Sequence, residues 1–150
     1  MRRLSSHTET WNWRDKYMVG VVVTSHGRLA DELLLTTVFI VGKAEQMVAL
    51  SVDPSRPIDK LQSDIRKAIK KVDTGDGVLI LTDMFGGTPA NMTLTFLEDN
   101  KVEVITGVNL PMLIKLCQCR NKDQTLHEVA DEVVDYSRKS INQATAILKK

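Results

Sequence analysis

The stretch VVVTSHGRLADELL, residues 21–34, joins a run of valines to a helix-like segment through a polar turn. The apolar run over residues 18–23 is typical of a strand that is buried on both faces of a parallel sheet. After the turn, apolar residues recur at spacings of one, three and four as far as Gly42, which is a suitable stop for a helix. The sequence therefore predicts a strand, a turn that contains His26, and a helix.

Strand and helix patterns continue to alternate along the chain. Further strands are predicted over residues 47–52, 78–83 and 101–106. Helices are predicted over residues 58–72, over about 89–97, within 107–119, and from Leu126 to Ile141. This alternation predicts an α/β fold in which a doubly wound, mostly parallel sheet carries helices on both faces.

Two helix starts carry recognisable capping residues. Thr88 is expected to be the N-cap of the third helix, with Pro89 at its first position. Thr125 and Glu128 have the spacing of a capping box at the start of the last helix.

Composition excludes several classes of protein. The chain has 150 residues, of which 43% are hydrophobic and 26% charged, and its net charge of +1 offers no basic surface for nucleic acid. No stretch approaches the roughly 18 consecutive apolar residues of a membrane span. The cysteines, Cys117 and Cys119, are too few for a disulfide scaffold, and their spacing on a helix turns them in different directions. We therefore expect a cytoplasmic protein with no bound metal and no cofactor.

The N-terminal residues have a different character. Residues 1–17 are polar and lack periodicity, and Met18 stands directly before the first predicted strand. We expect residues 1–17 to be a flexible extension, or Met18 to be the true start, and residues 18–150 to form a single domain.

Polar residues at the strand ends form a candidate active site. In doubly wound sheets, ligands bind beyond the carboxyl ends of the strands, where the strand order reverses. His26 follows the first strand and Asp83 ends the third, and these strands are neighbours in the common order 2-1-3-4. The Asp83 carboxylate would fix the tautomer of the imidazole, leave its other nitrogen free as a nucleophile, and stabilise the cationic ring.

The segment after Asp83 suits an anion. Gly86 and Gly87 allow the backbone to approach a ligand closely, and Thr88 adds a hydroxyl donor. The helices expected after Thr88 and after Gly27 would direct N–H groups with partial positive charge at the same place. A histidine between anion-binding groups indicates phosphoryl chemistry on the imidazole itself.

The segments SHGRLA, LTDMFGGTPAN and GVNLPML occupy residues 25–30, 81–91 and 107–113. They resemble the signature segments of the enzyme IIA domain of the mannose (fructose/mannose/sorbose) family of the phosphoenolpyruvate-dependent phosphotransferase system, and the similarity spans residues 18–147. The resemblance implies a phosphotransferase with a phosphohistidine intermediate. In this family, His26 would accept a phosphoryl group from the phosphocarrier protein HPr and pass it to an enzyme IIB, with membrane sugar permease subunits as indirect partners.

The resemblance also assigns further roles. Asp83 matches the aspartate that bonds the active histidine, and the phosphate would be surrounded by Met84, Phe85, Gly86, Gly87 and Thr88, with Gly27 beside it. The family implies a homodimer and an antiparallel fifth strand, which the sequence pattern does not locate. Arg28 stands where some members have an aromatic residue. The chain ends at Lys150, so we expect no fused IIB domain.

Alternative functions use the same residues. A regulatory protein could keep a phosphorylatable His26 and report on the phosphotransferase system, and a phosphoryl-donor subunit of a dihydroxyacetone kinase would resemble this domain. A receiver domain phosphorylated at Asp83 would need a pair of acids after the first strand, where Ser25, His26 and Gly27 stand. Structural roles for His26, as a capping residue, and for Asp83, as a strand end, also remain open.

Overall fold

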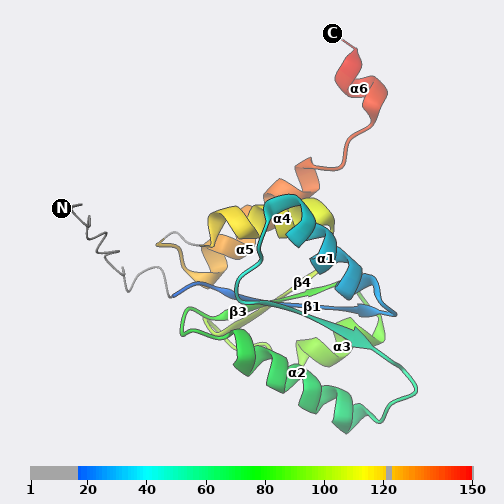
Figure 1. The fold of residues 1–150 in the computed structure, drawn as a ribbon, viewed down its shortest axis with the longest axis vertical. Coiled ribbons are helices and arrows are strands. Elements are labelled where there is room, and N and C mark those ends of the chain that lie inside the picture. The colour runs from blue at the N-terminus through cyan, green and yellow to red at the C-terminus, as the bar shows by residue number, and fades with distance from the viewer. Residues whose placement is uncertain (1–16, 121–122, 150) are drawn as a thin grey trace, which may run out of the picture.

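The computed structural model describes residues 17–120 and 123–149. Its centre is a four-stranded parallel sheet in the order β2-β1-β3-β4 (Figure 1). The strands are β1 (Gly20–His26), β2 (Met47–Val52), β3 (Val78–Thr82) and β4 (Val102–Thr106). The predicted doubly wound order is confirmed, and no fifth strand joins this sheet within the described residues.

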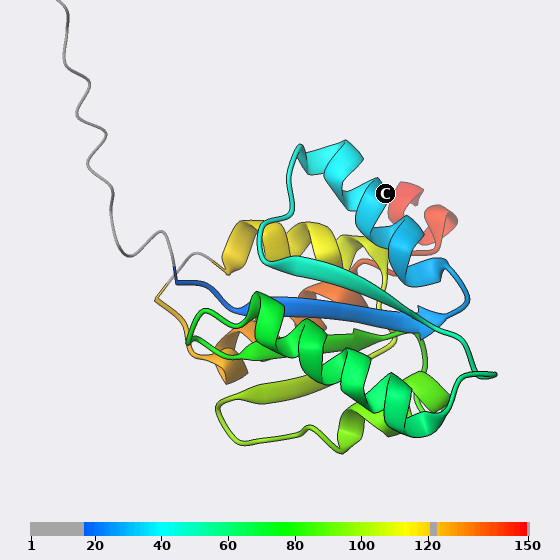
Figure 2. The same cartoon turned by 60° about the horizontal axis from the view of Figure 1, so that its bottom comes forward.

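Helices cover both faces of the sheet, as predicted. One face carries α1 (Leu29–Val41), α4 (Leu110–Cys119) and α5 (Leu126–Lys139), and the other carries α2 (Ile58–Val72) and α3 (Thr88–Leu94) (Figures 1 and 2). A short helix, α6 (Ala144–Leu148), follows α5 and extends away from the sheet (Figure 1).

The strands divide the core into two apolar clusters. Side chains alternate between the faces of a strand, so Val21 and Val23 pack toward α4 and α5, whereas Val22 packs toward α2. Every residue of β3 is buried, which explains its uninterrupted apolar sequence. Gly20 lets β1 approach α2 closely, because a Cβ there would meet the carbonyl group of Val72.

The end of the first strand differs from the prediction. We expected the strand to end at residue 23 and His26 to lie in a turn, but β1 continues to His26. The additional residues are held by pairing with β2, in which Ser25 lies opposite Ser51 and His26 opposite Val52. Pairing between strands thus outweighs the polar character of these residues.

The two ends of the third helix also differ from the prediction. Gly87 is its N-cap, and Thr88 is the first helical residue without a side-chain capping bond, so Thr88 is not the cap we expected. The helix ends at Leu94 and not near residue 97. A tight turn follows in which Asn100 adopts a φ of 58°, and this turn reverses the chain into β4.

The last helices confirm one prediction and correct another. Both hydrogen bonds of the capping box between Thr125 and Glu128 are present, at 3.2 and 2.8 Å. However, α5 ends at Lys139, so Ile141 lies outside it and is exposed. The helix α6 has no counterpart in our prediction.

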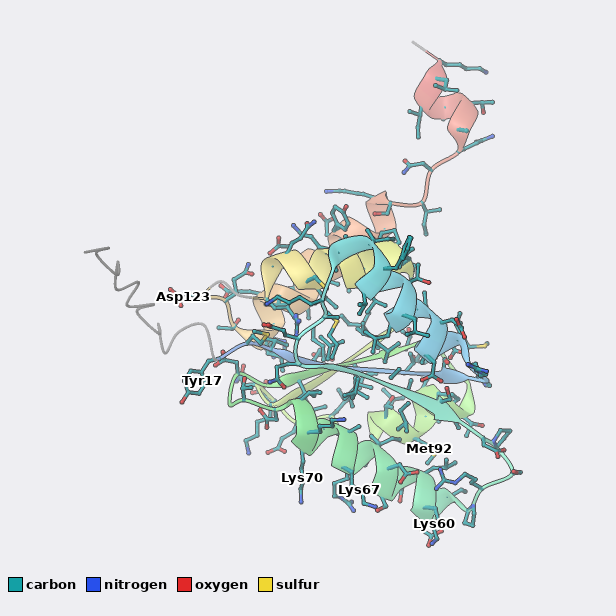
Figure 3. All side chains as sticks on the ribbon, viewed as in Figure 1. Tyr17, Lys60, Lys67, Lys70, Met92 and Asp123 are labelled. Atoms are coloured by element: carbon teal, nitrogen blue, oxygen red, sulfur yellow. The ribbon has the colours of Figure 1, made fainter. Side chains whose placement is uncertain are left out.

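The surface of α2 is lined with lysines. Lys60, Lys67 and Lys70 project from the outer side of α2, away from the sheet, whereas Met92 lies between the helices and the sheet (Figure 3). Among the described residues, no helix has the length and apolar character needed to span a membrane. The extension expected over residues 1–17 falls outside the described residues, apart from the exposed Tyr17.

Candidate active site

The structure brings His26 and Asp83 into direct contact at the carboxyl ends of β1 and β3. The ring Nδ1 of His26 lies 2.7 Å from Oδ2 of Asp83, and the backbone N–H of His26 donates to the same oxygen at 3.0 Å. The other carboxylate oxygen, Oδ1, accepts from the backbone N–H of Met84 at 3.0 Å. Asp83 therefore holds both the backbone and the ring of His26.

The electrostatics of this pair determine the tautomer of the histidine. Partial burial raises the pKa of the Asp83 carboxyl, but the hydrogen bonds from the His26 ring and backbone and from Met84 outweigh it, so the pKa is lowered. Asp83 is therefore ionised at neutral pH and acts as an acceptor only. Nδ1 of His26 must then carry the proton, and Nε2 keeps its lone pair in the neutral ring.

Gly87 lies against the free side of the imidazole. A Cβ at this position would be 2.6 Å from Cε1 and 3.2 Å from Nε2 of His26, so only glycine leaves the ring where it is. Gly86 adopts a φ of 80°, a conformation that favours glycine, with open space around it. The two glycines thus meet different requirements, a close approach at Gly87 and a left-handed turn at Gly86.

The other predicted residues surround this contact. The side chain of His26 is 48% exposed and that of Asp83 is 12% exposed, so a ligand can reach the ring while the carboxylate stays sheltered. Thr88, Met84 and Phe85 are exposed beside it. Within the described part of the chain, the backbone N–H groups of Gly86 and Gly87 donate to no protein acceptor. This arrangement combines a nucleophilic nitrogen with donors for an anion.

Sequence reasoning missed the role of Ser25, which organises the start of α1. The buried Ser25 hydroxyl accepts from the backbone N–H of Ala30 at 2.7 Å and donates to the carbonyl of His26 at 3.0 Å. Gly27, with a φ of 52°, turns the chain between them. Because Ser25 reaches five residues forward from a strand, no local capping pattern in the sequence reveals this contact.

The third signature segment lies at the same edge of the sheet. The backbone N–H groups of Gly107 and Val108 both donate to the carbonyl of Thr82, each at 2.9 Å. Asn109 then caps α4 by accepting from the N–H of Met112 at 2.9 Å. This segment supports the residue that precedes Asp83, and it contributes no side chain to the His26 contact.

The fold and the site together define a class of protein. It is a doubly wound α/β protein in which a carboxylate at the carboxyl edge of the sheet orients an accessible imidazole. Residues 20–134 match the family model described as the PTS system fructose IIA component. The chain therefore belongs to the enzyme IIA components of the mannose family of the phosphotransferase system, as its signature segments indicated.

Individual relatives agree with this assignment. The mannose-specific EIIAB component of Escherichia coli K12 is 30% identical over 85% of this chain, and the chain spans 40% of that protein's length. The fructose-specific EIIA component of Bacillus subtilis is 28% identical, over 89% of this chain and 91% of its own. A crystal structure of the IIA protein associated with the fucose utilization operon of Streptococcus pneumoniae has a TM-score of 0.78 and 27% identity, and covers 89% of this chain and 98% of its own.

Proposed function

We propose that this chain is a phosphoryl carrier that accepts a phosphoryl group on Nε2 of His26 from HPr and passes it to an enzyme IIB. The observation that supports this proposal is the 2.7 Å contact between Nδ1 of His26 and Asp83, because it leaves Nε2 as the nucleophile. Within the described residues, Nε2 has no hydrogen-bond partner of its own.

The proposed reaction has two steps. In the first step, a P–N bond forms at Nε2 of His26 while the P–N bond to the donor imidazole breaks, and the donor nitrogen keeps the electron pair. The His26 ring becomes cationic during the transfer, and the ionised Asp83 stabilises that charge. In the second step, the nucleophile of enzyme IIB takes the phosphoryl group, and His26 returns to the neutral ring.

The surrounding residues would serve the phosphoryl group. The N–H groups of Gly86 and Gly87 and the hydroxyl of Thr88 would donate to its oxygens, and Gly27 would leave the space beside His26 open. Met84 and Phe85, which are 54% and 74% exposed, would contact the partner protein. A cytoplasmic location and a homodimer are part of the same proposal, because they follow from the family.

A reconstituted transfer reaction tests this function. The chain is incubated with phosphoenolpyruvate, enzyme I and HPr, and intact-protein mass spectrometry should find one phosphoryl group, labile in acid and stable in base. His26→Ala should take up none, whereas the control His127→Ala, at an exposed histidine bonded to Asp99, should be phosphorylated normally.

Adding candidate enzyme IIB proteins then separates the carrier from its alternatives. Loss of the label to a IIB protein is expected of a carrier. Phosphorylated protein that transfers to no IIB would instead favour the regulatory alternative, and transfer to a dihydroxyacetone kinase subunit would favour the donor alternative. Full labelling of His26→Ala would contradict the site.

A further inference from the structure

The proposed phosphate site contains no positively charged side chain among the residues assigned to it. His26, Gly27, Asp83 and residues 84–88 include one carboxylate and no lysine or arginine. A phosphoryl group on the ring would bring close to two negative charges next to the Asp83 carboxylate. Repulsion between them would favour loss of the phosphoryl group, so a nearby cation would have a large effect on how much phosphorylated protein is present.

Arg28 is a cation two residues from His26 in the chain. Gly27 turns the backbone with a φ of 52°, and Arg28 follows as the N-cap residue of α1. Its side chain is 80% exposed, so the guanidinium stands in solvent at the start of α1. Among the described residues, it makes one ion pair, with Glu32, at 3.4 Å, and the side chain of Glu32 is itself 60% exposed.

This ion pair is easily exchanged for another. A separation of 3.4 Å is at the long end of hydrogen-bond distances, and solvent screens a pair in which both groups are exposed. The arginine also precedes the glutamate along the helix, which is the weaker of the two orientations for a pair four residues apart. A phosphoryl group carries more charge than Glu32 and matches the guanidinium fork with two oxygens.

The arginines of the loop after β2 and of α2 are already engaged. Arg56, in the loop that follows β2, is held by Asp64 at 2.7 Å, and its side chain is only 42% exposed. Arg66, on α2, has its guanidinium over the ring of Phe96. Arg28 therefore combines proximity in the chain with a weak competing partner.

We propose that Arg28 is the charge partner of the phosphorylated imidazole: its guanidinium leaves Glu32 and binds the phosphoryl oxygens once the group is on His26. This inference rests on the proposed function. It also gives Glu32 a role, because a carboxylate that competes for Arg28 lowers the affinity of the site for the phosphoryl group.

The equilibrium constant for phosphoryl exchange with purified phospho-HPr tests this role. Docking of the donor changes the forward and reverse rates of transfer by the same factor, so it does not change the equilibrium constant. The constant therefore reports on the stability of the phosphorylated site and not on partner recognition. Arg28→Gln should lower the constant on the order of tenfold, and Arg28→Lys should restore part of it, because lysine keeps the charge and loses the fork. Glu32→Gln should raise it by about twofold.

Three further tests separate this role from an effect of structure or of overall charge. The control Arg56→Gln removes the same net charge from the same edge and should leave the constant unchanged. In ³¹P NMR, the titration midpoint of the phosphohistidine should move to higher pH in Arg28→Gln, since a nearby cation favours the more negative phosphoryl group. The effect of Arg28→Gln should also shrink at 1 M salt, where exposed charges are screened.

The outcomes distinguish this inference from the function on which it rests. A wild-type chain that takes up no phosphoryl group would overturn both. The wild-type chain could instead be phosphorylated while Arg28→Gln keeps the wild-type equilibrium constant and the wild-type titration midpoint. That result would overturn the role of Arg28 and leave the carrier function standing. An equal loss in Arg28→Gln and Arg56→Gln would also overturn it, because the effect would then be one of overall charge.

Discussion

Replacing Gly87 by alanine is expected to abolish most phosphoryl uptake without unfolding the protein. The added Cβ would lie 2.6 Å from Cε1 and 3.2 Å from Nε2 of His26. Carbon atoms pack at about 3.5–4.0 Å, so the imidazole must move away by about 1 Å. A displacement of this size at a reacting group costs on the order of 100-fold in rate.

The same displacement weakens the contact that orients the ring. The bond between Nδ1 of His26 and Asp83 is 2.7 Å long, and a hydrogen bond to a charged group contributes about 1.5–3 kcal/mol. The backbone itself does not resist the substitution, because Gly87 has a φ of −80° and a ψ of 165°, a conformation open to alanine. The rate should therefore fall while the melting temperature changes by only a few degrees.

The assay is the initial rate of phosphoryl uptake from phospho-HPr, followed by intact-protein mass spectrometry beside a thermal melt. Gly42→Ala is the matched control, because Gly42 has a φ of 91°, open surroundings, and a position at the far end of α1. That variant should lose about 1–2 kcal/mol of stability and keep its rate. A wild-type rate in Gly87→Ala, with the His26 ring resonances unmoved, would refute the reasoning.

Four further outcomes are expected. Asp83→Asn should transfer phosphoryl groups roughly 10 to 1,000 times more slowly, by analogy with other carboxylates that orient catalytic histidines. A wild-type rate would contradict this. The pKa of Asp83 is lowered in the folded protein, so its carboxylate stabilises the fold above pH ~4, and this effect is lost as pH falls through the lowered pKa. The free energies of unfolding of wild type and Asp83→Asn, measured in urea, should therefore converge in acid. Gly20→Ala should destabilise the fold by about 1–3 kcal/mol in urea, because its Cβ meets the carbonyl of Val72, and an unchanged midpoint would refute that packing. The hydrogen bond to Asp99 raises the pKa of His127, so this pair stabilises the fold below pH ~6.5 and that effect is lost as pH rises through the raised pKa. An NMR titration should place the pKa of His127 above ~6.5 and Asp99→Asn should lower it, whereas no change would exclude the contact.

The regular elements could be predicted because their signals are local. The bounds of β2 and α2 agree with the predicted ranges, since an apolar run between turn residues and a clear helical repeat are enough to define them. The end of β1 could not be predicted, because pairing with β2 extends it through three polar residues. The helix α6 lacks buried residues, so no apolar pattern marks it.

The contact between His26 and Asp83 could be predicted from the sequence, but its geometry could not. His26 and Asp83 could be named from their positions after two strands, but the choice of Nδ1 as the bonded nitrogen depends on a side-chain rotamer that no pattern encodes. The reason for Gly87 also changed. The sequence indicated room for a phosphate, whereas the structure adds that the glycine makes room for the imidazole itself.

The register between β1 and β3 sets the contact between His26 and Asp83. Thr24 lies opposite Thr82, and the residues that follow place the two side chains at the same edge. Because successive side chains point to opposite faces, a slip of one residue would turn His26 away from Gly87. The valines that pack β1 into both apolar clusters fix this register, so the core of the sheet holds the proposed nucleophile in place. Core substitutions that shift β1 against β3 should therefore impair phosphoryl transfer before they unfold the chain.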